Sequence, residues 1–285
     1  MRAAPPGAAP TAPRVSEFTF EQLRGLLGNV LGRGAMGTVY ALRGYQGLAV
    51  KEIRLDSLNE KAIDALMLEL DVLPGLHHPG VLRYHQVIKG NDLVYIVMDR
   101  HSRTLNDLVI ECKQGDRPIS VTMILSSVRQ LVAALAYLHS VSGVGADGHP
   151  YQGLVHRDLK PANVLISKKG KRFIIADFGL CKDALRCGST YAGTPLYMAP
   201  ETLIRNKTSP ASDVWSLGVI LYELTTLRRP DFLGGKEPAE VFIDGWRPDL
   251  SGVTDGFIKS VLERIFVLEP ERRPTARELC EMLRQ

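Results

Sequence analysis

The pattern of apolar residues changes near Asp99, and this change constrains the fold of the 285-residue chain more than any other feature. Before that point, apolar residues form short runs separated by glycine-containing turns, which is typical of strands. After it, they recur at three- and four-residue steps over longer segments, which is typical of amphipathic helices. Strands followed by helices indicate an α+β fold of two lobes, joined near residues 99–101.

Strands and one helix are predicted in the first lobe. The strands are expected at residues 38–42, 48–53, 81–84 and 93–98. The helix follows Ser57, because Glu60 stands three residues later in the spacing of a capping box. Its apolar residues recur at Ile63, Leu66, Leu70 and Leu73. Pro74 ends this helix, and Glu69 lies beside its apolar stripe rather than opposite it.

The second lobe is predicted to be mainly helical. Its helices are expected around Ile124–Leu138, from Asp213 to about Leu224, around 255–267 and around 275–284. Ser120 is the expected cap of the first of these helices. Residues 141–153 indicate a flexible insertion. The apolar runs at 164–166 and 173–176 indicate a small hairpin that ends at Asp177.

Composition and charge argue against several classes of protein. The net charge of +4 is too balanced to favour nucleic acid or a membrane surface as a partner. No apolar run reaches about 18 residues, so no transmembrane helix is expected. Residues 1–16 are rich in Ala, Pro and Gly, lack the apolar core of a signal peptide, and are interpreted as a disordered tail. The four cysteines fit neither metal-ligand nor disulfide spacing, so a cytoplasmic location is expected.

A glycine-rich turn stands at the start of the strand region. Gly32, Gly34 and Gly37 are spaced G-x-G-x-x-G and are followed by Val39. Without a Cβ, such residues let the backbone approach a phosphate and direct its N–H groups at it. A dinucleotide-binding fold would need a helix directly after the glycines, whereas residues 38–42 predict a strand. Alone, this spacing would equally fit a plain hairpin turn.

A lysine follows the glycine turn in the next predicted strand. Lys51 comes after the apolar pair Ala49 and Val50, fourteen residues beyond Gly37. A lone lysine is usually an exposed surface residue, but the glycine turn before it favours a role at a phosphate. Glu69 is then either a solvated helix charge or the partner that holds Lys51 in place.

The run His156–Asn163 contains the densest group of reactive side chains. It places the carboxylate of Asp158, the ammonium of Lys160 and the carboxamide of Asn163 within six residues, and Asp177 follows fourteen residues later. Two carboxylates and an amide can hold Mg²⁺ by oxygen ligands and orient a hydroxyl for attack on phosphate. Alone, the run could be a solvated loop, so its meaning depends on the glycine turn and Lys51 preceding it.

Together these motifs resemble those of the eukaryotic protein kinases, over roughly residues 24–285. Further motifs of that superfamily are Asp177-Phe178-Gly179, Ala199-Pro200-Glu201, Asp213 and Arg273. Within it, the chain looks most like the NIMA-related (Nek) kinases, on the basis of residues 156–163, 177–180, 190–195 and the insertion before His156. The resemblance implies a bilobal protein-kinase fold. Its N-lobe, at about 17–98, would hold an antiparallel sheet and one helix, followed by a hinge at 99–101 and a helical C-lobe at 102–285.

The activity implied by the resemblance is that of a non-specific serine/threonine protein kinase that uses ATP and Mg²⁺. The glycines would cover the ATP phosphates, and Lys51, paired with Glu69, would bind the α- and β-phosphates. Asp158 would accept the proton of the substrate hydroxyl, and Lys160 would steady the γ-phosphate. Asn163 and Asp177 would hold Mg²⁺. The nucleotide would also contact Leu31, Val39, Ala49, Met98 as gatekeeper, Asp99, His101 and Leu165.

Substrate class and regulation also follow from the resemblance. Lys160, together with Thr194, matches the pattern of kinases that act on serine and threonine. Arg157, directly before Asp158, suggests control by phosphorylation of the loop, with Thr190 as the best site and Ser189 as its competing neighbour. A buried pair between Arg273 and Glu201 is implied as well.

Two departures and two alternatives accompany this interpretation. Pro230-Asp231-Phe232 has one residue more than the family's usual Pro-Phe, so peptide docking near it is not carried over, and Glu269-Pro270 stands where Asp-Pro is common. No coiled-coil tail is expected. A pseudokinase scaffold would usually lack Lys51, Asp158 or Asp177, all of which are present. A small-molecule kinase would not be expected to carry Gly193-Thr194-Pro195. A role at the spindle, centrosome or cilium would follow from family analogy alone.

Overall fold

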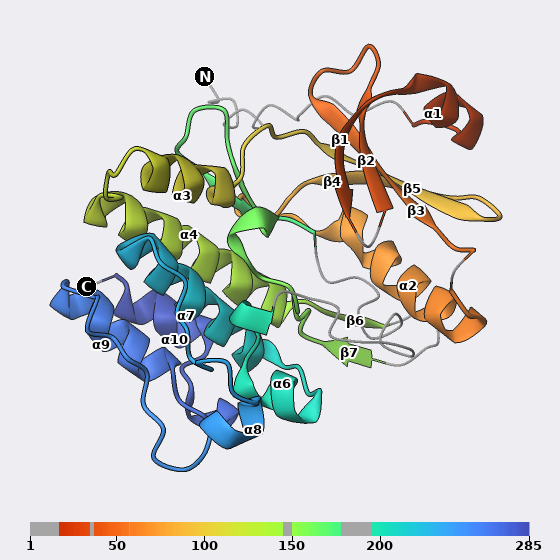
Figure 1. Ribbon diagram of the computed structural model, residues 1–285. Helices are drawn as coiled ribbons and strands as arrows, with labels where there is room; N and C mark the ends of the chain where they lie inside the picture. Colours follow the sequence, from red (N-terminus) through yellow and green to blue (C-terminus); the bar gives the residue numbers. More distant parts are fainter. Residues whose placement is uncertain (1–16, 35–36, 57, 145–149, 178–194, 285) are drawn as a thin grey trace, which may run out of the picture.

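A computed structural model describes residues 17–34, 37–56, 58–144, 150–177 and 195–284 of the chain. It has two lobes: a small one built on a sheet, and a larger one built mainly of helices (Figure 1). The bilobal α+β fold expected from the sequence is therefore confirmed.

An antiparallel sheet forms the N-lobe, with the strand order β1-β2-β3-β5-β4. Its strands are β1 (Leu27–Gly34), β2 (Gly37–Leu42), β3 (Leu48–Arg54), β4 (Tyr84–Lys89) and β5 (Leu93–Asp99). The prediction of a strand at 81–84 is wrong, because β4 begins only at Tyr84. The backbone at Val81 and Leu82 instead turns toward the C-lobe, where the Leu82 N–H donates to the Ile175 carbonyl at 2.9 Å.

The two faces of the sheet have separate apolar clusters. Along β3, Ala49 and Ile53 belong to the large cluster that continues into the C-lobe, whereas Leu48 and Val50 belong to a smaller outer one. This follows from the period of two in a strand, which sends successive side chains to opposite faces. Lys51 shares the inner face with Ala49.

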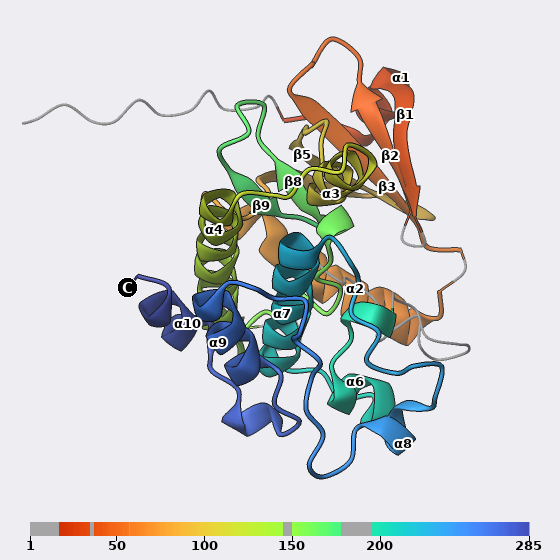
Figure 2. The same ribbon diagram turned by 60° about the vertical axis from the view of Figure 1, so that its left-hand side comes forward.

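A helix that the sequence did not predict covers the outer face. Helix α1 (Phe20–Leu26) is capped by Thr19, and its Leu23 is fully buried in the outer cluster. The Gln86 amide fixes the chain just before α1, since it accepts from the Phe18 N–H and donates to the Phe18 carbonyl, each at 2.9 Å. Figures 1 and 2 show α1 on the outer side of the sheet. The N-lobe therefore has a helix beyond the single one expected.

Helix α2 (Glu60–Val72) is the helix predicted between the second and third strands. Its N-cap is Asn59, whose side chain accepts from the Ala62 N–H at 2.9 Å. The capping box expected from Ser57 and Glu60 is therefore wrong, because Asn59 is an equally good cap and places Glu60 at the first helical position. Ser57 itself lies outside the described residues. Pro74 ends the helix as predicted, within the 3-10 turn η1 (Leu73–Gly75).

Helices make up most of the C-lobe. They are α3 (Leu105–Gln114), α4 (Val121–Ser140), α6 (Pro200–Arg205), α7 (Pro210–Thr226), α8 (Pro238–Val241), α9 (Gly256–Ile265) and α10 (Ala276–Met282). Three 3-10 turns lie among them: η2 (Pro161–Asn163), η3 (Pro195–Tyr197) and η4 (Pro270–Arg272). Helix α7 is buried over most of its length, as its apolar sequence predicted. Ser120 caps α4, as predicted.

Helix α4 is long and apolar enough to cross a membrane, judged by length and composition. In this protein it packs against α7, α10 and the strand β9 (Phe173–Ile175), and its apolar stripe lies in the main cluster. This packing explains its composition, which is that of a core helix.

The insertion at 141–153 is partly ordered into a small hairpin. Strand β6 (Ser142–Val144) pairs with β7 (Pro150–Gln152), while residues 145–149 lie outside the described part. The sequence did not predict these two strands. The hairpin is closed where the Gly153 N–H donates to the Val141 carbonyl at 2.8 Å.

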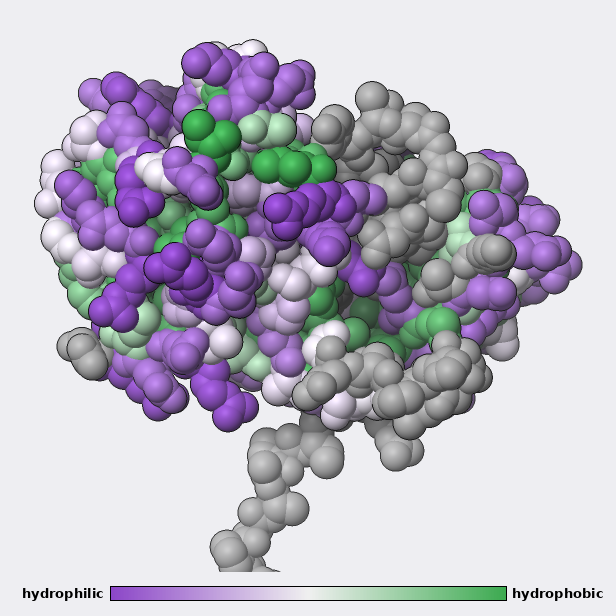
Figure 3. Space-filling model, turned by 90° about the horizontal axis from the view of Figure 1, so that it is seen from below, coloured by the Kyte–Doolittle hydropathy of each residue, from purple (hydrophilic) through white to green (hydrophobic). Residues whose placement is uncertain are grey.

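Aromatic rings hold the lower part of the C-lobe together. Trp215 on α7 is fully buried, and its ring contacts those of Phe232, Phe242, Trp246 and Phe266. Phe232 comes from the segment with the additional residue, so that departure from the family pattern is absorbed by core packing. Seen from below, the molecule is mainly hydrophilic with a few apolar patches (Figure 3).

Candidate active site

The loop that carries Asp158 is held in place by a buried carboxylate. Asp213 lies in the first turn of α7, where its two oxygens accept from the His156 N–H at 2.8 Å and the Arg157 N–H at 2.9 Å. His139, near the end of α4, approaches the same carboxylate at 2.9 Å. Because α7 is the central helix of the core, this clamp gives the loop a rigid foundation.

His156 links this loop to the segment that ends in Asp177. The Asp158 N–H donates to Nδ1 of His156 at 3.2 Å, so the ring proton must lie on Nε2, which donates to the Ala176 carbonyl at 2.9 Å. Complete burial lowers the pKa of His156, and the neutral ring fits this pattern of one acceptor and one donor. The sequence did not assign this function to His156.

Asp158, Lys160 and Asn163 converge, as their spacing predicted. The Asn163 amide Nδ2 donates to the Asp158 carbonyl at 2.8 Å and to its Oδ2 at 3.1 Å. Lys160 Nζ lies 3.0 Å from the same Oδ2. Asn163 belongs to η2, directly before strand β8 (Val164–Ile166), which pairs with β9 as the predicted hairpin. The carboxylate is thus oriented by an amide and an ammonium from its own loop.

Lys51 and Asp177 meet across the two lobes. Lys51 Nζ lies 2.5 Å from Asp177 Oδ1, with the lysine buried and the aspartate half-exposed. Asp177 has a φ of 54° and Arg157 a φ of 66°, a region that residues other than glycine rarely adopt. Such backbone strain persists where the surrounding structure enforces it, which is common at active sites.

The expected pairing of Lys51 with Glu69 is not formed in this structure. Glu69 Oε1 instead lies 2.9 Å from Arg157 Nη1, while Lys51 is paired with Asp177. Glu69, the expected partner of Lys51, is thus paired with Arg157, which was expected to meet a phosphate on the loop. Lys51 is paired with Asp177, which was expected to hold Mg²⁺. The position of α2 places Glu69 beside the Arg157 guanidinium, whereas Lys51, on β3, reaches Asp177.

The strand register brings the predicted nucleotide-contacting residues into one region. Val39 on β2 stands opposite Lys51 on β3, and Ala49 stands opposite Met98 on β5. Directly opposite residues share a face of the sheet, so these side chains all lie on the inner side. Leu165 on β8 packs against the same cluster from the C-lobe. The predicted nucleotide contacts thus come from the N-lobe sheet on one side and from the C-lobe on the other.

The glycine turn connects β1 and β2 as expected. Gly37 has a φ of 131°, and a Cβ there would lie 1.9 Å from the Glu52 carbonyl oxygen, so only glycine fits. At Gly32 and Gly34, a Cβ would meet no described atom within 4 Å. Leu31, beside them, is exposed. This open backbone can be approached closely by a phosphate.

The two predicted hinge residues lie at the end of the sheet. Asp99 pairs with Leu48 in the strand register, and its Oδ1 lies 2.8 Å from His85 Nε2. His101 is partly buried, and this burial lowers its pKa. Tyr84, on the neighbouring strand, is buried, and its pKa is raised by burial and by the charge of Asp177. Neither Tyr84 nor His85 carried a sequence signal beyond its place in an apolar segment.

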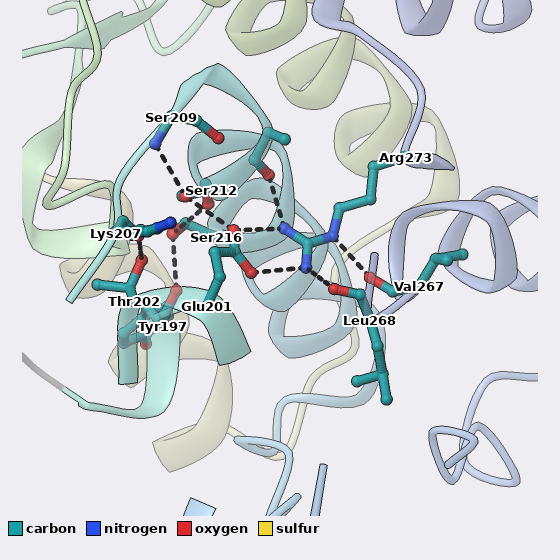
Figure 4. A network of polar contacts seen from close by, with 11 residues as sticks. Tyr197, Glu201, Thr202, Lys207, Ser209, Ser212, Ser216, Val267, Leu268 and Arg273 are labelled. Atoms are coloured by element: carbon teal, nitrogen blue, oxygen red, sulfur yellow. Dashed lines mark hydrogen bonds and ion pairs between the residues drawn. The ribbon is translucent and has the colours of Figure 1, made fainter. Parts of the chain in front are cut away.

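Below the site, the implied pair of Glu201 and Arg273 is confirmed. Arg273 Nη1 and Nη2 lie 2.7 and 2.8 Å from the two Glu201 oxygens, and Ser212 donates to Glu201 at 2.8 Å (Figure 4). The remaining hydrogen bonds of the guanidinium go to the carbonyls of Val267, Leu268 and Ala211. Two parallel hydrogen bonds of this kind are the strongest form of an ion pair.

Several predicted positions lie outside the described residues. These are Phe178, Gly179, Thr190, Ser189 and Thr194.

The fold and the constellation of charged residues between its lobes define the class of this protein. Residues 27–283 match the family model described as Protein kinase domain, and the chain belongs to that family.

The relatives include proteins named as kinases and proteins named for cytokinesis. The chain is 32% identical over 260 residues to cytokinesis protein sepH of Emericella nidulans, covering 90% of this chain and 18% of that protein. It is 31% identical over 271 residues to mitogen-activated protein kinase kinase kinase ANP1 of Arabidopsis thaliana, covering 89% and 38%. It is 29% identical over 259 residues to the probable serine/threonine-protein kinase nek2 of Dictyostelium discoideum, covering 87% and 60%. The chain thus spans only part of each relative's length.

Proposed function

We propose that this chain is a serine/threonine protein kinase that transfers the γ-phosphate of ATP to hydroxyls of protein substrates. The observation that carries the proposal is the convergence of Lys160 and Asn163 on the Asp158 carboxylate. A carboxylate fixed by two donors of its own loop is suited to orient a substrate hydroxyl and accept its proton. The names of the relatives from Arabidopsis and Dictyostelium support the protein-kinase class and the Ser/Thr type.

Charge in the cleft supports phosphate binding. Lys51 approaches from the N-lobe and Lys160 from the catalytic loop, and the open backbone at Gly32 and Gly34 adds N–H groups. In this proposal Lys51 binds the α- and β-phosphates, and Lys160 binds the γ-phosphate. Preorganised cations and dipoles of this kind stabilise the charge that develops during phosphoryl transfer.

Asn163 and Asp177 fit a Mg²⁺ ion. The Asn163 amide uses Nδ2 for its bonds to Asp158, so its Oδ1 points the other way, and Asp177 is half-exposed at the end of the hairpin. An amide oxygen and a carboxylate form the hard-oxygen donor set that Mg²⁺ prefers. When bound, the ion neutralises charge on the phosphates.

Activation is proposed to exchange the partners of the four charges. In this step Glu69 leaves Arg157 and pairs with Lys51, which releases Asp177 for the metal. Phosphorylation of Thr190, or of the neighbouring Ser189, would supply a new anion for Arg157 and so favour the exchange. The observed pairs Glu69–Arg157 and Lys51–Asp177 are the starting point of this proposal.

The experiment combines the protein with Mg²⁺ and ATP on a peptide library containing serine, threonine and tyrosine acceptors. Asp158→Asn is the control, and we expect it to reduce transfer by about 10²–10⁴-fold, the contribution typical of a catalytic base. Transfer no greater than that of the control would refute the proposal and favour a pseudokinase scaffold. Phosphotyrosine as the main product would refute the Ser/Thr assignment, and transfer to small molecules alone would refute the protein substrate.

A further inference from the structure

A buried carboxylate in the last turn of α7 gathers donors from several elements. Glu223 has a side chain that is only 2% exposed, and its Oε2 accepts from the Tyr197 hydroxyl at 2.5 Å. Arg229 Nε lies 3.3 Å and Lys113 Nζ 3.4 Å from its Oε1. Burial, followed by the hydrogen bond to Glu223, raises the pKa of Tyr197, so this hydroxyl keeps its proton and acts as the donor.

The cluster of Tyr197, Glu223, Lys113 and Arg229, here termed the Glu223 cluster, carries excess positive charge. One carboxylate is shared by two cations, which leaves a net charge of +1 among these four side chains. The negative group is hidden, whereas the Lys113 side chain is 38% exposed and that of Arg229 is 49% exposed. The part of the cluster that a binding partner can reach is therefore cationic.

Backbone strain helps to bring Arg229 to this position. Leu227, directly after α7, has a φ of 54°, and its N–H donates to the Glu223 carbonyl at 2.8 Å. This left-handed turn reverses the chain, so that the Arg229 side chain contacts Glu223, six positions earlier in the helix. A leucine rarely adopts such a conformation, and strained residues of this kind tend to occur at functional sites.

The Glu223 cluster lies near the catalytic loop. Glu223 and Asp213 are ten residues apart on one helix, which is about 15 Å at a rise of 1.5 Å per residue. Asp213 holds the backbone next to Asp158, and α3, which carries Lys113, packs against η2, which contains Asn163. The end of α7 lies beside α3, since Lys113 on α3 approaches Glu223 (Figure 2). An extended peptide covers about 15 Å with roughly five residues.

We propose that Lys113 and Arg229, held in place by Glu223, form a subsite for an acidic side chain of the protein substrate. The acidic residue would lie within about five positions of the phosphorylated hydroxyl. This inference rests on the proposed kinase activity, because it assigns part of the substrate specificity to the same cleft.

The opposite preference, for a basic substrate residue, is disfavoured by the contacts of Glu223. Its carboxylate already accepts from three donors out of the roughly four that such a group can accommodate. A basic side chain would also have to approach two cations of the same sign. A purely structural function for the cluster is the remaining alternative, and the ionic-strength test below separates it from a binding subsite.

The experiment measures kcat/KM for peptides with one serine acceptor. Glu, Gln, Arg or phosphoserine is placed in turn at each of the five positions on either side of the acceptor. For the unmodified chain we expect Glu to exceed Gln by roughly threefold to tenfold at one or two positions, as for a partly exposed charge-assisted contact. The preference should decrease at high salt, because exposed charges are screened. Phosphoserine at the same position should be preferred at least as strongly as Glu.

Two variants and a matched control identify the residues responsible. Lys113→Met and Arg229→Met should each lower the ratio of Glu to Gln peptides, whereas Arg264→Met, which removes an exposed charge from α9, should leave that ratio unchanged. Thermal unfolding of each variant establishes that it is folded.

Three results would overturn the subsite. These are a preference for Arg over Gln, a ratio that both variants leave unchanged, and a fall in activity that is equal for Glu and Gln peptides and insensitive to salt. The last result would assign the cluster to structure alone. Transfer without any charge preference would refute the subsite and leave the kinase proposal intact, whereas absence of transfer to every peptide would refute both.

Discussion

Removal of the Arg273 guanidinium should destabilise the C-lobe strongly. The side chain is fully buried, makes two hydrogen bonds to Glu201, and stacks over the Trp215 ring with its Cζ 4.9 Å from the ring centroid. In Arg273→Met the largely buried Glu201 would keep only its hydrogen bond from the Ser212 hydroxyl. Three backbone carbonyls would also lose the hydrogen bond that they accept from Arg273. Breaking a buried pair of this type costs about 3–5 kcal/mol of unfolding free energy. For a chain of this length, that corresponds to a decrease in Tm of about 6–10 °C.

The matched control is the adjacent arginine. Arg272 has a side chain that is 71% exposed and lies 3.8 Å from Glu269, so Arg272→Met should change the unfolding free energy by less than about 1 kcal/mol. The double variant Glu201→Met with Arg273→Met should be more stable than Arg273→Met alone, because no unpaired charge remains in the core. Differential scanning calorimetry and urea titration measure all three. Equal effects of the two single arginine variants, or a double variant less stable than Arg273→Met, would refute this reasoning.

Three further predictions follow from single residues. Gly37→Ala should raise the KM for ATP and lower Tm, because its Cβ would collide with the Glu52 carbonyl; unchanged values in kinetic and thermal assays would contradict the close approach. Leu23→Ala should lower the unfolding free energy by about 2–5 kcal/mol in urea titrations, as for a fully buried leucine, and a loss below 1 kcal/mol would mean that α1 is only loosely packed. The buried, neutral His156 should make the protein less stable as the pH is lowered. Below about pH 6.5 the unfolded chain binds a proton that the folded chain does not, so the unfolding free energy decreases by up to about 1.4 kcal/mol for each pH unit of acidification. His156→Gln should reduce this slope between pH 7.5 and 5.5, and an identical slope would assign the pH dependence to other groups.

Much of the N-lobe could be predicted from the sequence because its strands obey a simple period. The apolar run at 48–53 predicted a strand, and the structure has β3 at Leu48–Arg54, where the period of two places Ala49 and Lys51 on one face. Helix α1 could not be found this way, because it is short and Leu23 is its single buried residue. Its stability comes from packing on a sheet whose strands lie up to about 70 residues later, a contact that no local pattern encodes.

The convergence of Asp158, Lys160 and Asn163 was predictable from the sequence, whereas the ion-pair partners of Lys51 and Glu69 were not. Asp158, Lys160 and Asn163 lie on one loop, so their spacing determines which groups can meet. Lys51 and Glu69 belong to separate elements, and their distance depends on where α2 sits relative to the sheet. The sequence identifies the charged residues, but the position of α2 decides which of two carboxylates, Glu69 or Asp177, pairs with Lys51.

The clamp between Phe18 and Gln86 also has a consequence for synthesis on the ribosome. The two residues are 68 positions apart, so α1 leaves the ribosome long before the strand that holds it. At about 5–20 residues per second, this delay is roughly 3–14 s. During that interval Phe18 and Leu23 can cover only the part of the outer face that β1 to β3 provide, because β4 and β5 have not been made. They are then exposed to any chaperone that binds nascent apolar segments. The outer face of the N-lobe is therefore completed late, although the helix that closes it is made before the strands it covers.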